Sequence, residues 1–164
     1  MSENTHHDPH HAHAEPTRHG HDPHHHAGHG NDAFTELMSR VMATSPRFGH
    51  REHIYLTWLA VREHGAEEAI GLVSAGIAAV TRAEGVPGKY HATITRAWVE
   101  LVAHHAGGTR PATSFKAFAE ANPLLLDKQL LKTFYRTDTL ARDEARANWV
   151  EPDLKPFPWQ HAAP

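Results

Sequence analysis

Apolar residues recur at helical spacing through the middle of the chain. Large apolar side chains stand three or four positions apart in two consecutive segments, first Ile54, Trp58 and Val61, then Ile70, Val73, Ile77 and Val80. This spacing places them along one side of a helix. It predicts helices over residues 49–64 and 66–84, which end at Gly65 and Gly85.

A further helix is predicted over residues 89–105, after a turn at Pro87 and Gly88. Its apolar side consists of Tyr90, Ile94, Trp98 and Leu101. Tryptophan side chains belong to a hydrophobic core more often than to a cofactor site. We therefore expect Trp58 and Trp98 to lie in the core between the helices.

Weaker patterns flank this centre. Asp32 is a good N-cap for a first helix over residues 33–44. Shorter helices are predicted over 113–121, over 124–134 and from Thr137 or Asp138 to Trp149, and extended chain is predicted beyond, at Pro152, Pro156 and Pro158. No strand pattern of useful length occurs. The predicted fold class is all-α, a single helical bundle of about four main helices with short C-terminal helices, over residues 33–164.

The first 32 residues differ from the rest in composition. They hold eleven of the 18 histidines, namely His6, His7, His10, His11, His13, His19, His21, His24, His25, His26 and His29. Large apolar side chains are almost absent. Such a segment buries too little apolar surface to offset the entropy lost on ordering. A disordered His-rich tail is therefore predicted ahead of the helical domain.

Imidazole chemistry predicts that this tail binds metal ions. Neutral imidazole is a good ligand for zinc, nickel, copper and cobalt. A flexible tail offers many alternative pairs of ligands, which favours several ions bound weakly over one ion bound tightly. The alternative interpretation is a solubilising tail that binds metal only when it is offered.

Charge and cysteine usage narrow the classes of function. The tail carries a net charge of −4 and the remaining residues about +1, which gives no signal for nucleic acid or a membrane surface. The chain has no cysteine, which excludes disulfides, zinc–thiolate sites, iron–sulfur clusters and cysteine nucleophiles. No apolar run approaches the ~20 residues of a membrane span, and no signal peptide is evident. We expect a soluble cytoplasmic protein.

Three histidines outside the tail form a candidate metal site. His50 and His53 are three residues apart, so they share one face of the second predicted helix. His91 lies near the start of the predicted helix over residues 89–105. This is the fourth predicted helix, and the second and fourth helices of a bundle often lie side by side. Three imidazoles from two helices could hold zinc, copper, nickel or iron with one position open. The alternative is that all three are part-buried histidines bonded to carbonyl or carboxylate groups.

Polar residues near His91 suggest two further contacts. Lys89, at the start of the same predicted helix, is a candidate contact for a small-molecule anion. If the metal site is catalytic, Tyr90 would be the acid, base or orienting group and Thr95 would lie near the substrate. The alternative is that Pro87 and Gly88 form a capping turn and Tyr90 packs.

Longer sequence strings resemble a family of small, largely uncharacterised bacterial all-helical proteins. The similar segments are Phe48-x-His50-x-x-His53, then Gly85-x-Pro87-x-Lys89-Tyr90-His91-x-Thr93-x-Thr95, the string 118–127, and 139–154. The resemblance spans roughly residues 48–154 and implies one intact helical domain without implying an activity. Gly49 stands where Thr or Ser is expected as an N-cap.

Three functions remain open from the sequence. The first is a metal-binding protein that binds, stores or delivers a divalent transition metal through the tail and the His50/His53/His91 site. The second is a small metal-dependent enzyme with the same three ligands. The third is a non-catalytic helical interaction domain with structural histidines. The residues do not distinguish zinc, nickel, copper, cobalt and iron.

Overall fold

The computed structural model describes residues 25–161, and within them every regular element is helical. The longer helices are α1 (His25–Met42), α2 (His50–His64), α3 (Ala66–Ala83) and α4 (Ala92–Ala106). The shorter ones are η1 (Pro87–Lys89), α5 (Phe115–Ala121), η2 (Pro123–Leu126), η3 (Lys128–Thr133), α6 (Thr137–Ala141), α7 (Asp143–Ala147) and η4 (Pro158–His161). The predicted all-α bundle of four main helices is confirmed.

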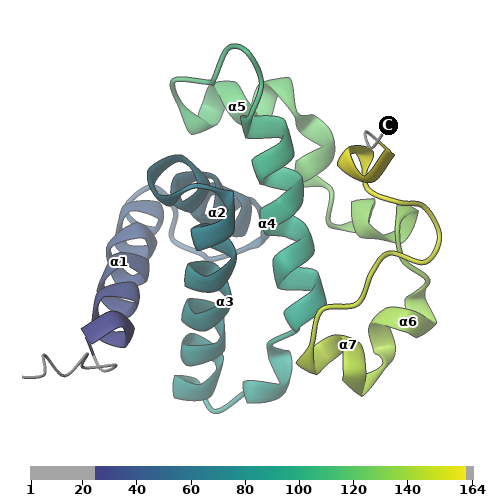
Figure 1. Cartoon of the computed structure of the whole chain (residues 1–164). Helices are drawn as coiled ribbons and strands as arrows, with labels where there is room; N and C mark the ends of the chain where they lie inside the picture. The colour runs from purple at the N-terminus through teal and green to yellow at the C-terminus, as the bar shows by residue number, and fades with distance from the viewer. Residues whose placement is uncertain (1–24, 162–164) are drawn as a thin grey trace, which may run out of the picture.

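Helices α2, α3 and α4 pack on one another, and α1 lies against α2 and α3 (Figure 1). On the far side of α4 from α1, α7 covers its N-terminal half. Trp58 and Trp98, both 3% exposed, are buried as predicted. The Trp58 ring contacts Phe115 and Phe118, which ties α5 to the same core.

A close crossing holds α1 on α3. Gly76 is buried on the α1 side of α3, and the ring of Phe34 occupies the space where a Cβ would stand. Phe34 is only 3% exposed. Glycine is therefore required at this position by the approach of a neighbouring ring, and not by the backbone dihedral angles.

The C-terminal part is fixed to the bundle by hydrogen bonds to backbone atoms. The fully buried Thr93 hydroxyl of α4 donates to the Asn148 carbonyl (2.6 Å) and accepts from the Val150 amide (3.1 Å). The Tyr135 hydroxyl donates to the Val150 carbonyl (2.7 Å). Phe157 is completely buried, so the extended chain beyond α7 is part of the core.

Several predicted boundaries need correction. The first helix begins at His25 and not at residue 33, so Asp32 lies inside it and is not an N-cap. Residues 25–32, expected in the disordered tail, are thus helical, while residues 1–24 lie outside the described residues. The segment 124–134 forms two short 3-10 helices, because Asp127 is extended and its carboxylate accepts from the Gln129 amide (2.9 Å).

The last predicted helix, up to Trp149, is also divided. Arg142 adopts an extended conformation between α6 and α7.

Among residues 25–161, no helix combines the length and the apolar character that crossing a bilayer requires.

Candidate functional site

His50, the first residue of α2, is bonded to the protein backbone. Its Nε2 donates to the Leu125 carbonyl of η2 (2.9 Å). The ring also lies edge-on to Trp98, with 4.7 Å between the ring centroids. His50 therefore joins three parts of the core, which is the structural role that the sequence left open as an alternative.

His91 caps α4 with its side chain. Its Nδ1 accepts from the Ile94 amide (3.2 Å), and its Nε2 donates to the Leu140 carbonyl of α6 (2.8 Å). Burial lowers the pKa of this imidazole, although the Leu140 carbonyl opposes the effect. Both ring nitrogens are already used, so a metal ion could bind only after one of these bonds was broken.

His53 lies one turn beyond His50 on α2 and is in a different situation. Its Nε2 is enclosed and has no hydrogen-bond partner among the described residues. Burial, and next the neighbouring His50, lower the pKa of His53 to about 4. The ring is therefore neutral at physiological pH, and its burial makes protonation of the folded protein costly.

The structure does not assemble the three-imidazole site. Within residues 25–161, no three His, Asp or Glu side chains are placed so that they could hold one metal ion. The physical reason is that the Leu125 and Leu140 carbonyls bind His50 and His91. The Nε2 of His53 is the enclosed side-chain nitrogen that lacks a hydrogen-bond partner among residues 25–161.

The residues expected around that site are also dispersed. Lys89, the candidate anion contact, is exposed at the end of η1. It does not belong to α4, which begins at Ala92 and not at residue 89 as predicted. Tyr90 is half-buried and Thr95 is buried in α4. A substrate site at Tyr90 and Thr95 thus has no metal centre beside it in the described part of the chain.

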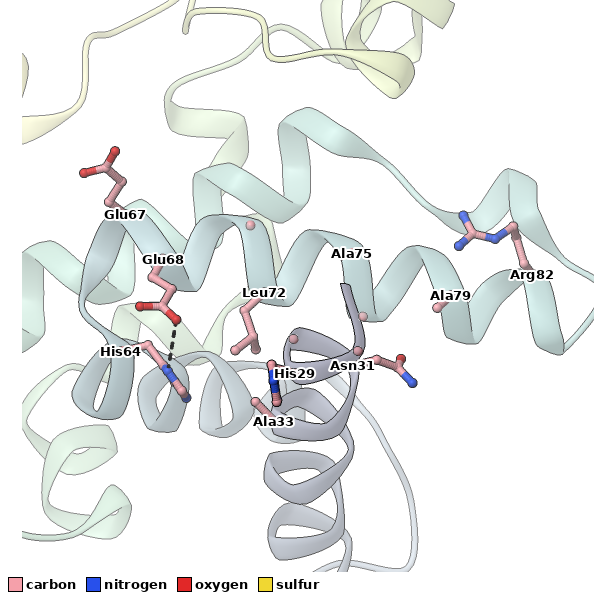
Figure 2. Close-up of a pocket in the computed structure, with 14 residues that line it drawn as sticks. His29, Asn31, Ala33, His64, Glu67, Glu68, Leu72, Ala75, Ala79 and Arg82 are labelled. Carbon is pink, nitrogen blue, oxygen red and sulfur yellow. Dashed lines mark ion pairs between the residues drawn. The ribbon is translucent and has the colours of Figure 1, made fainter. Parts of the chain in front are cut away.

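A second group of ligand-type side chains lines a pocket near the start of α1. The α1–α3 pocket has a volume of about 1030 Å³ and is bounded by the N-terminal part of α1, the end of α2 and one side of α3. Figure 2 shows His29, His64 and Glu68 on its wall, with Leu72 and the small residues of α3 forming its floor. Histidines from α1 and α2 and a carboxylate from α3 thus line the same pocket.

His64 and Glu68 are brought together by a one-residue link between helices. Gly65 ends α2 and precedes α3 with φ of 82°, a conformation that favours glycine. The His64 Nδ1 then lies 3.5 Å from the Glu68 Oε1. The His64 side chain is 25% exposed and that of Glu68 is 68% exposed, so both are open to solvent.

The sequence interpretation missed this pocket. The sequence placed His29 in the predicted tail and did not single out His64 as a ligand. The four-residue spacing of His64 and Glu68 was a usable signal, since such pairs are neighbours on a continuous helix. No comparable sequence pattern indicated that α1 would form part of the pocket wall.

No family model, curated protein or solved structure matches this chain. The resemblance to a family of bacterial helical proteins therefore stays a prediction.

Proposed function

We propose that this protein binds divalent transition-metal ions through its N-terminal end. The observation that carries the proposal is the concentration of eleven histidines in residues 6–29, the His-rich segment. His6 to His24 lie outside the described residues, whereas His25, His26 and His29 belong to α1. The segment therefore runs directly into a helix that is packed on the bundle.

The chemistry of the segment supports several ions of moderate affinity. Imidazole nitrogens accept zinc, nickel, copper, cobalt and iron, and this segment offers no thiolate that would select among them. Repeated His-His and His-x-His pairs provide many alternative chelates. Binding, storage or delivery of the ion are the activities that such a segment can support.

The folded bundle serves as the platform for this segment in our proposal. The Nε2 atoms of His50 and His91 are bonded to backbone carbonyls, which favours the histidines of the His-rich segment as the ligands. The enzyme alternative loses its supporting observation, because His50, His53 and His91 do not form a shared centre. The interaction-domain alternative is the outcome to expect if no metal is bound.

Equilibrium dialysis of the full chain against ZnCl₂ tests the proposal. The wild-type protein should bind more than one zinc ion per chain at neutral pH. Binding should be largely lost near pH 5, because free imidazoles with a pKa of about 6.5 are protonated there. A variant with all eleven histidines of the segment replaced by asparagine should lose most of the bound zinc.

The matched control replaces two histidines outside the segment, His104 and His105, by asparagine. Zinc binding by this control should stay close to that of the wild type. If the wild-type chain binds less than one ion, or if the variant lacking the segment's histidines binds as much as the control, the proposed function is wrong.

A further inference from the structure

We propose that a second pocket, between α2 and the start of α5, binds the phosphate group of a small organic molecule. This α2–α5 pocket has a volume of about 370 Å³, which is within the usual range for small-molecule sites. Arg51 and Tyr55 of α2 and Phe115 and Lys116 of α5 lie on its wall. No described residue of the His-rich segment lies there, so this inference does not depend on the proposed metal binding.

Arg51 supplies a positive charge that the fold positions but does not neutralise. Its guanidinium lies over the Phe115 ring, with 5.1 Å between Cζ and the ring centroid. Within residues 25–161, Arg51 forms no ion pair. Its N–H donors are therefore available to an anion. Tyr55, one turn further along α2, stacks on the same Phe115 ring with 4.5 Å between centroids, and the two rings give the pocket an apolar side for an organic group.

Lys116 and Ser114 add donors from the start of α5. The Lys116 ammonium is 3.5 Å from the Glu120 carboxylate, but the two side chains are 82% and 68% exposed, so this ion pair is weak and exchangeable. The Ser114 Oγ accepts from the Ala117 amide (3.2 Å), while its O–H has no acceptor among residues 25–161. Two cations and a hydroxyl match the three terminal oxygens of a phosphate monoester better than the two oxygens of a carboxylate.

Glu52 also lies on the wall, and its negative charge opposes the binding of an anion. Its Oε2 accepts from the Gly49 amide (3.0 Å), which holds the carboxylate at the start of α2 as a helix cap. Glutamine can make the same capping hydrogen bond. Glu52→Gln therefore removes the opposing charge and keeps the cap, so it should bind phosphate more tightly than the wild type.

Arg62 provides a matched control on the same helix. Its guanidinium also lies over an aromatic ring, with 4.5 Å between Cζ and the centroid of Trp58. Like Arg51, it is exposed and forms no ion pair within the described part of the chain. Arg62 does not line the α2–α5 pocket. Replacing it removes the same charge from α2 without removing a phosphate ligand.

The experiment is a titration of the full chain with phenyl phosphate at low salt, followed by the backbone amide signals in NMR. At pH 8 the free imidazoles of the His-rich segment are neutral, so they do not attract the anion. The amides of Arg51 and of residues 114–116 should shift and reach saturation. Arg51→Gln should weaken binding roughly tenfold and Lys116→Gln roughly threefold, while Glu52→Gln should strengthen it roughly threefold. Arg62→Gln should stay within about twofold of the wild type.

The opposite effects of Arg51→Gln and Glu52→Gln separate a binding site from damage to the fold, because a misfolded variant would not bind more tightly. The absence of a saturable shift at the pocket amides would overturn the proposal. Equal affinities of Arg51→Gln and Arg62→Gln would also overturn it, since the anion would then respond only to the total charge of α2. An unchanged affinity of Glu52→Gln would contradict the placement of the phosphate in this pocket.

Discussion

Replacing Gly76 by alanine should lower the free energy of unfolding by about 3 kcal/mol, the upper part of the range for overpacked cores. The added Cβ would overlap the ring of Phe34, which is buried between α1 and α3. The ring cannot move aside without leaving its place in the core. We expect α1 to separate from α3, and this should appear as a lower midpoint in urea unfolding.

Gly71→Ala on the same helix is the matched control. Gly71 is exposed, and a Cβ there would meet nothing within 4 Å. Alanine should therefore stabilise the protein by up to about 1 kcal/mol through its helix propensity. Equal stability of Gly76→Ala and Gly71→Ala would contradict the packing of α1 on α3, and with it the wall of the α1–α3 pocket.

Acidification from pH 7 to pH 4 should destabilise the protein through His53, by about 3 kcal/mol for this residue. The pKa is about 4 in the folded state and about 6.5 in an unfolded chain. Between these values the unfolded state binds a proton that the folded state does not bind. The contribution of neutral His53 to the free energy of unfolding is therefore complete above about pH 6.5. It is lost as the pH falls towards 4.

His53→Leu should remove this part of the pH dependence. Leucine is of similar size and leaves no enclosed nitrogen unpartnered, so stability at neutral pH should be unchanged or higher. His91, whose pKa is also lowered by burial, should still cause a smaller loss in the same direction. Urea unfolding at a series of pH values measures both effects.

His105→Leu serves as the control for acid sensitivity, because His105 is bonded to the Leu101 carbonyl near the exposed end of α4. It should retain the wild-type pH dependence. If His53→Leu has the same pH dependence as the wild type, then His53 is not an enclosed neutral imidazole.

The central helices were predictable because local signals agree. The apolar stripe of α3 and the glycines at both its ends predicted residues 66–84, and the helix spans Ala66–Ala83. Gly65 and Gly85 both have positive φ, which explains why the helices end there. The start of α1 was missed since histidine and glycine before residue 32 are typical of irregular chain.

The roles of the buried histidines were not predictable from their spacing. His50 is bonded to a carbonyl 75 residues away and His91 to one 49 residues away. Every residue has a backbone carbonyl, so the sequence does not indicate which one will accept a hydrogen bond from a given histidine. Only the fold shows that these two imidazoles are bonded to carbonyls. The sequence predicted that His50 and His53 lie on one helix and His91 near the start of another, which the structure has, but it could not show their partners.

The central claim is that metal is bound by the His-rich segment at the N-terminal end, and not by the histidines of the core. The most direct test is a ZnCl₂ titration of the full chain, followed by residue-specific NMR of the imidazole resonances. We predict that the signals of the His-rich segment shift, while those of His50, His53 and His91 remain unchanged. Shifts confined to the latter three would contradict the account.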